Sequence, residues 1–300
     1  MDRGTPEVTP ADSTIEPSGF VVLVGASERI HFLDWGGAGG PGVLLVHGLA
    51  ATAWAWTPVA RRLAGHRRTV AMDLRGHGLS DSPTSGYDPD SLADDVVAVA
   101  EGSGLLTSGP IVLAGHGFGA MVAAWTAARL GGDCAGLVLV DGGWEDIAAT
   151  SGLTADEFLR GLDEPPEVLR SMDAYLADRR GFDPATWDAD QEQAARAAIV
   201  ELPAGRVVSA TRPHALAACV ESMLEYDPAA TLAAVDAPIA ALVAAEDEAG
   251  TRRAALAAVQ QAVTAARSAI RVVDLGDVGH NVMRYRPRDV TETILDVVVG

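Results

Sequence analysis

The sequence predicts an α/β protein built on a doubly wound, mostly parallel eight-stranded sheet with an inserted helical cap. Short, unbroken apolar runs alternate with helical segments along most of the chain. Such runs are typical of parallel strands that helices cover on both faces. The apolar runs stop between residues 144 and 235, where helical patterns follow one another. This interruption predicts an insertion between two halves of one sheet.

Each strand is expected where four to six apolar residues occur together. The first two runs are separated by a tight polar turn, which favours an antiparallel hairpin. The expected strands are 20–24, 30–35, 43–46, 69–72, 111–114, 136–140, 239–244 and 270–275. The expected helices are 54–64, 91–101, 118–130, 252–266 and 288–298 in the core, and 155–162, 167–179, 190–202 and 214–226 in the cap.

These patterns divide the chain into a leader, a core and a cap. Residues 1–17 are rich in Pro, Thr, Asp and Glu, with neither a basic start nor an apolar run, so we expect a flexible leader and a cytoplasmic protein. Residues 18–143 and 233–300 are expected to form the core, and residues 144–232 the helical cap.

Charge and cysteine content argue against several classes of partner. The formal net charge is -19, and all 22 basic residues are arginines that form no dense block. This pattern favours neither nucleic acid nor an anionic membrane as a partner. Cys134 and Cys219 lie in apolar surroundings without metal-ligand or redox spacing, so we expect buried thiols and no zinc site. A small-molecule substrate is expected, with a monomer or a homodimer equally compatible with the sequence.

The segment Gly115-His116-Gly117-Phe118-Gly119 follows the fifth expected strand and opens a helix. It resembles the nucleophile elbow, G-x-Nuc-x-G, of the α/β-hydrolase family. The outer glycines are expected to let the helix approach the strand closely. The central residue is Ser, Cys or Asp in the family, whereas here it is Gly117, which has no side chain. Covalent catalysis from this position is therefore excluded.

The resemblance extends over the chain from Phe20 onward and implies a base and an acid in the family order. His280 follows the last expected strand and is the predicted general base. Asp247 follows the strand before it and is the favoured acid, with Glu248 as its neighbouring alternative. Asp141 ends the sixth strand, a place that supplies the acid in a minority of members, but its expected role is that of a structural carboxylate.

Further site residues are implied by the same resemblance. The segment His47-Gly48-Leu49-Ala50 resembles the family's oxyanion loop, and the backbone N–H groups of Leu49 and Phe118 are predicted to form the oxyanion hole, with Ala50 as the alternative to Leu49. The residues expected beside the substrate are His116, Trp56 and Trp144.

The family resemblance implies action on a small organic molecule, with no cofactor and no metal, but it does not fix which bond is broken. Three hypotheses follow from Gly117. In the first, the chain is an ester-, thioester- or lactone-type hydrolase that is inactivated or engineered at its nucleophile. In the second, it is a natural enzyme in which the His280–Asp247 pair acts as general base for cyclisation, elimination or hydrolysis without a covalent step. In the third, it binds a small molecule without turnover.

Overall fold

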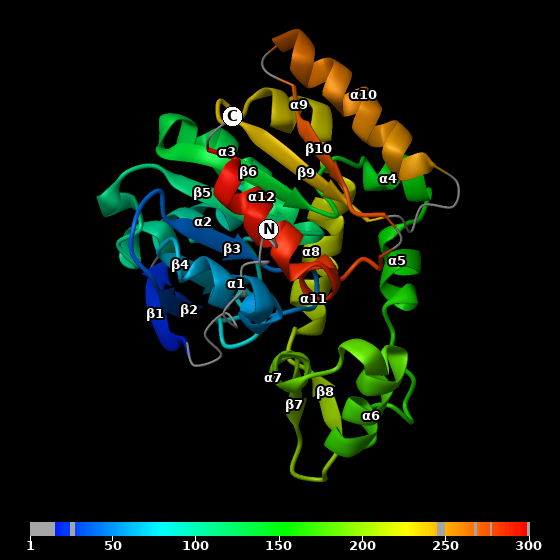
Figure 1. The fold of residues 1–300 in the computed structure, drawn as a ribbon. Coiled ribbons are helices and arrows are strands. Elements are labelled where there is room, and N and C mark those ends of the chain that lie inside the picture. The colour runs from blue at the N-terminus through cyan, green and yellow to red at the C-terminus, as the bar shows by residue number, and fades with distance from the viewer. Residues whose placement is uncertain (1–15, 25–27, 245–249, 267–268, 277, 299–300) are drawn as a thin grey trace, which may run out of the picture.

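The computed structural model describes residues 16–24, 28–244, 250–266, 269–276 and 278–298. The predicted leader lies almost wholly outside them. The described chain forms an eight-stranded sheet in the order β1-β2-β4-β3-β5-β6-β9-β10 (Figure 1). The first two pairings, β1 with β2 and β2 with β4, are antiparallel, and the other five are parallel. The predicted fold class is confirmed.

The strands lie close to the predicted apolar runs. Their bounds are β1 Ser18–Val24, β2 Glu28–Gly36, β3 Val43–Val46, β4 Thr69–Met72, β5 Ile111–His116, β6 Cys134–Val140, β9 Ile239–Val243 and β10 Arg271–Asp274. Every residue of β3 and β5 is buried, which is why their sequences read as continuous apolar runs rather than as alternating ones.

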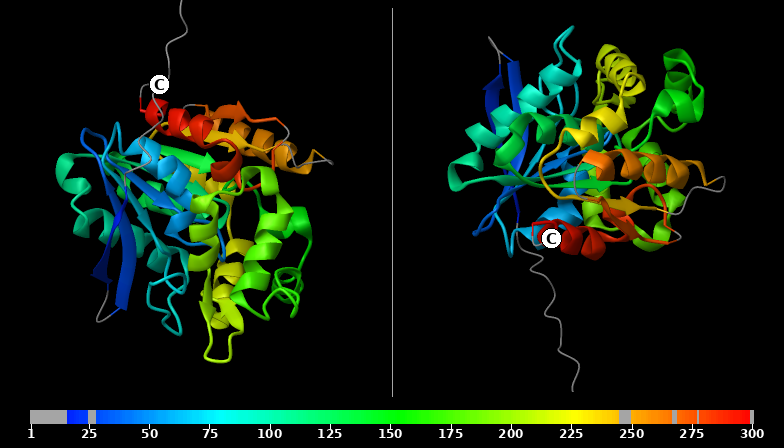
Figure 2. Two further views of the ribbon diagram at one scale, coloured as in Figure 1. Left: turned by 60° about the horizontal axis from the view of Figure 1, so that its bottom comes forward. Right: turned by 90° about the horizontal axis from the view of Figure 1, so that it is seen from above.

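Two helical layers cover the sheet, and alternate strand residues point to each. In β3, Leu44 and Val46 join one core cluster, while Val43 and Leu45 join the other. The first cluster packs under α2 Pro89–Gly102, α3 Phe118–Leu130 and α10 Thr251–Ala266. The second packs under α1 Thr57–Leu63, α11 Val282–Tyr285 and α12 Pro287–Asp296. Figure 2 shows the sheet between the two layers.

The insertion lies between β6 and β9 and is not wholly helical. It contains α4 Ile147–Ser151, α5 Ala155–Gly161, α6 Met172–Phe182, α7 Ala189–Ala197, β7 Ile199–Glu201, β8 Val207–Ser209 and α8 Pro213–Leu224, after which α9 Pro228–Ala233 leads back to the sheet. The predicted helix over 190–202 is wrong in its second half, because β7 pairs with β8 as an antiparallel hairpin. Ile199 and Val207 from this hairpin pack with Tyr175 and Leu176 of α6 in a small separate core.

In Figure 1 the segment from α6 to β8 projects below the sheet, whereas α4, α5 and α8 lie beside it. The predicted limits of the cap, 144 and 232, remain a prediction. Among the described helices, none combines the length and the apolar composition needed to cross a lipid bilayer.

Candidate active site

The turn between β5 and α3 has the geometry of the predicted elbow. Gly117, its central residue, has φ +54° and ψ -119°, a left-handed conformation that costs glycine least. A Cβ on Gly115 would collide with the Gly119 carbonyl oxygen, and a Cβ on Gly119 would collide with the His47 carbonyl oxygen. The two outer glycines therefore allow the close packing that the sequence predicts for them.

His280 faces the elbow from the loop between β10 and α11. A Cβ built on Gly117 would lie 3.3 Å from His280 Nε2, and the next nearest atoms are His280 Cε1 at 3.6 Å and Gly48 Cα at 3.9 Å. The structure thus brings together the predicted base and the predicted nucleophile position, although 163 positions of sequence, from 117 to 280, separate them.

The carboxylate that contacts His280 is Asp141, at the end of β6. His280 Nδ1 lies 2.6 Å from Asp141 Oδ2. The predicted acid Asp247 and its alternative Glu248 lie outside the described residues. The expectation that Asp141 is only a structural carboxylate needs correction. Its carboxylate contacts His280 Nδ1, while the other ring nitrogen of His280, Nε2, faces Gly117.

Asp141 is held in a conformation that few non-glycine residues adopt. Its φ is +47°, in the left-handed region, and strain of this kind is found preferentially at functional sites. Its N–H donates to the Leu242 carbonyl at 2.9 Å, and its Oδ1 accepts from the Ala244 N–H at 3.0 Å. Burial acts to raise the pKa of Asp141, but the His280 hydrogen bond and the Arg252 charge outweigh it, so the pKa lies below its usual value.

Arg252 and Glu145 complete the polar surroundings of Asp141, and no sequence motif marks either residue. Arg252 Nη1 donates to both Asp141 carboxylate oxygens at 3.0 and 3.2 Å, and its Nη2 donates to the Asp141 carbonyl at 3.1 Å. Arg252 also donates to both carboxylate oxygens of Glu145, at 2.7 and 3.2 Å. No spacing in the sequence links an arginine at the start of α10 with two acids that follow β6.

The two predicted oxyanion-hole donors lie together at the cavity. Leu49 and Phe118 both line it, and within the described part of the chain neither N–H has a hydrogen-bond partner. The N–H of Ala50, the alternative donor, instead donates to His77 Nε2 at 3.2 Å. Phe118 is also the first residue of α3, where the helix dipole favours negative charge.

His116 lines the cavity, while the two tryptophans do not. The His116 Nε2–H donates to the His280 carbonyl at 2.9 Å, and the centroids of the two imidazole rings are 4.4 Å apart. Burial and the neighbouring His280 lower the pKa of His116 to about 3, so it is neutral near pH 7. The prediction that Trp56 and Trp144 contact substrate is not supported, because both side chains are 0% exposed and pack in the two apolar cores.

These residues surround a cavity of about 480 Å³ under the cap. The sheet side contributes the polar groups described above. The cap side contributes apolar side chains from α4, from α5 and the residue after it, and from α8, namely Ile147, Phe158, Leu162 and Met223. A concave, mostly apolar site with a few convergent polar groups is typical of small-molecule binding.

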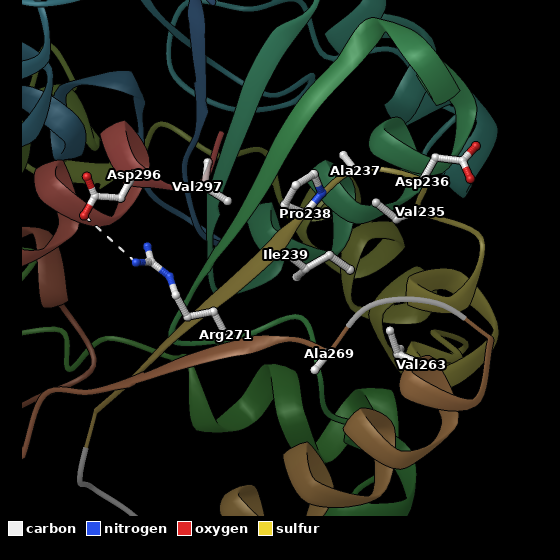
Figure 3. A pocket seen from close by; sticks show the side chains of 10 residues that line it. All are labelled: Val235, Asp236, Ala237, Pro238, Ile239, Val263, Ala269, Arg271, Asp296 and Val297. Atoms are coloured by element: carbon white, nitrogen blue, oxygen red, sulfur yellow. Dashed lines mark ion pairs between the residues drawn. The ribbon is translucent and has the colours of Figure 1, made fainter. Parts of the chain in front are cut away.

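A second hollow, of about 590 Å³, lies near the start of β9 and β10 (Figure 3). Apolar residues such as Ile239 and Val263 line it, and Arg271 and Asp296 form an ion pair at 4.0 Å across one side. It carries no histidine and no hydroxyl or thiol nucleophile among its described lining residues. Parallel sheets place their sites at the carboxyl ends of strands, so this hollow is not the candidate active site.

The fold and the site define a class of α/β protein with a histidine–carboxylate pair beside a strand–turn–helix elbow. The model of the alpha/beta hydrolase family matches residues 43–293, which is most of the chain. The chain belongs to this family.

Individual relatives match over part of their length. The chain is 32% identical over 141 residues to 2-(acetamidomethylene)succinate hydrolase of Mesorhizobium japonicum, covering 47% of this chain and 49% of the relative. It is 40% identical over 114 residues to N-formylmaleamate deformylase of Pseudomonas putida, covering 38% and 41%. The match thus spans about half of these relatives or less.

Solved structures agree in fold over nearly the whole chain. A crystal structure of E-2-(acetamidomethylene)succinate hydrolase superposes with a TM-score of 0.76 at 22% identity, covering 95% of this chain and all of that one. The thioesterase domain from the curacin biosynthetic pathway superposes with a TM-score of 0.72 at 21% identity, covering 93% and 99%. At this level of identity the likeness shows the fold alone.

Proposed function

We propose that this protein hydrolyses a carboxylic-ester-type bond in a small organic molecule without an acyl-enzyme, using His280 and Asp141 to activate water. The observation that carries the proposal is the position of His280 Nε2, 3.3 Å from where a Cβ on Gly117 would lie. A water molecule in the space that a serine side chain occupies in relatives is within reach of this nitrogen.

The reaction follows from the directions of the hydrogen bonds. His280 Nε2 takes a proton from water as the water oxygen attacks the substrate carbonyl carbon. Asp141 holds Nδ1–H and stabilises the imidazolium that forms. The N–H groups of Leu49 and Phe118 stabilise the developing oxyanion. Collapse breaks the bond to the leaving group, which receives the proton from Nε2, and the acyl part leaves as a carboxylic acid.

Two features support turnover over simple binding. Asp141 has a left-handed backbone, and from there its carboxylate contacts His280 at 2.6 Å. Leu49 and Phe118 line the same cavity as His280, and neither N–H has an acceptor among the described residues. A binder needs neither arrangement, whereas general-base hydrolysis needs both.

The test compares the wild type with Gly117→Ser and His280→Ala on 4-nitrophenyl esters, with a fluorophosphonate as a probe for an active serine. We expect the wild type to hydrolyse the esters without a burst and without labelling. We expect His280→Ala to lose about 10²–10⁴-fold in kcat/KM, and only Gly117→Ser to label.

Each contrary result overturns the proposal. A wild type that is inactive while Gly117→Ser is active would be a silenced serine hydrolase. A wild type that remains inactive alongside an inactive Gly117→Ser would favour a binder or a different reaction. Unchanged activity in His280→Ala would exclude the histidine as the base.

A further inference from the structure

The charged residues around the cavity form one closed group. Arg252 is the cation among the described lining residues, and the carboxylates there are Asp141 and Glu145. Arg252 directs Nε, Nη1 and Nη2 at these two acids, and its guanidinium also stacks 5.5 Å over the Trp144 ring. Each guanidinium nitrogen therefore already has an acceptor.

The two acids differ in what else they bind. Asp141 is shared between Arg252 and His280, so its charge also serves the histidine. Glu145 pairs with Arg252, and its side chain is only 8% exposed. A buried carboxylate and a guanidinium in bidentate contact hold each other firmly, and neither leaves the pair without losing strong hydrogen bonds.

We propose that Glu145 is a specificity-determining residue: by occupying Arg252, it makes the cavity accept uncharged, apolar acyl groups and reject acyl groups that carry a carboxylate. That the ligand is an acyl group rests on the proposed function. The preference for an uncharged ligand over a carboxylate concerns binding alone. The described lining holds two carboxylates against one guanidinium, and both carboxylates already engage that guanidinium, so an incoming anion meets two like charges and no unengaged arginine.

The apolar half of the cavity agrees with this selectivity. Ile147 and Phe158 come from the cap, and Met121 comes from α3. Burying an uncharged alkyl chain against such side chains is favourable, whereas a carboxylate there loses its hydration without gaining a partner.

The experiment uses two ketones that cannot be hydrolysed and that differ at one end of the chain. Valerophenone ends in a methyl group, and 4-benzoylbutanoate ends in a carboxylate in its place. Their dissociation constants are measured by isothermal titration calorimetry at pH 7.5 for the wild type, Glu145→Gln, Glu145→Asp and a control, Glu164→Gln. Glu164 pairs with Arg179 in the cap at 2.6 Å and does not line the cavity, so its variant makes the same charge change elsewhere.

We expect the wild type to bind valerophenone at least about tenfold more tightly than 4-benzoylbutanoate, since one like charge nearby is sufficient for such a ratio. Glu145→Gln should reduce this preference about tenfold, whereas Glu145→Asp and Glu164→Gln should keep it. Equal binding of the two ketones by the wild type, or a preference that Glu145→Gln leaves unchanged, overturns the inference.

These outcomes are distinct from those that test the proposed function. Because neither ketone turns over, the preference is measured whether or not the protein hydrolyses esters. Thermal melting of each variant shows whether it is folded, and Glu145→Asp retains the charge if the Gln variant does not fold.

Discussion

His280 and Asp141 are joined by a 2.6 Å contact between Nδ1 and Oδ2 across 139 positions of sequence. The contact fixes which ring nitrogen of His280 is directed to Gly117, because the other nitrogen is occupied. Asp141 is itself held by Arg252 and by the N–H of Ala244, directly after β9. These contacts at the carboxyl end of the sheet therefore set the direction of the His280 ring.

Asp141→Asn should therefore abolish most of the activity. An amide can neither carry the charge that stabilises the imidazolium nor keep the same tautomer of His280. We expect kcat/KM to fall by about 10²–10⁴-fold, measured on the best ester found for the wild type.

The matched variant is Asp247→Asn, which makes the same change at the acid that the sequence favours. We expect it to retain most of the wild-type activity. If Asp247→Asn loses activity as severely while Asp141→Asn does not, the acid is the one predicted from sequence, and the contact described here is not the catalytic one.

Replacement of Gly117 should test the backbone of the elbow. At φ +54° a residue with a Cβ is strained, and the new Cβ would lie 3.3 Å from His280 Nε2. We expect Gly117→Ser and Gly117→Ala to fold with an unfolding free energy lower by about 1–3 kcal/mol. Urea unfolding measures this difference, and a variant more stable than the wild type would contradict the strain.

Most of the fold could be predicted because its central strands β3, β4, β5 and β9 are buried on both faces. The runs at 43–46 and 111–114 have no polar residue, and few structures other than a covered parallel strand explain them. The hairpin of β7 and β8 could not be predicted because each strand has only three residues and only one residue separates β7 from the end of α7. Its stability comes from packing on α6, which local sequence does not encode.

The site could be predicted only in part, for a related reason. Gly117 and His280 stand in motifs whose order along the chain identifies them. Asp141 and Asp247 both follow strands, and sequence order alone does not say which carboxylate points at His280. Arg252 lies at the start of α10 and Asp141 directly after β6, and no sequence motif marks a contact between these two positions.

Acid should destabilise the protein through two buried histidines. Burial is the main cause that lowers the pKa of both His77 and His116 to about 3. Below the ordinary value near 6.5 the unfolded chain binds these protons and the folded chain does not. The free energy of unfolding that depends on these two neutral histidines is therefore fully present above about pH 6.5. It falls as the pH drops toward 3, by about 1.4 kcal/mol per pH unit for each histidine.

Urea unfolding at pH 7, 6, 5 and 4 measures this slope. We expect His77→Gln to lower the slope by about 1.4 kcal/mol per pH unit, since glutamine does not titrate. His66→Gln makes the same substitution at an exposed position and is the control. An identical slope in His77→Gln and the wild type would show that His77 does not contribute.

Gly115 and Gly119 should tolerate no side chain. A Cβ on either would overlap backbone oxygen, which cannot move without separating α3 from β5 or from the His47 loop. We expect Gly115→Ala and Gly119→Ala to lower the unfolding free energy by more than about 3 kcal/mol, or to prevent folding. Gly132→Ala is the matched control, because a Cβ there meets no atom within 4 Å. Thermal melting of all three variants measures the difference. If Gly115→Ala melts at the same temperature as Gly132→Ala, β5 and α3 are not packed as closely as the structure has them.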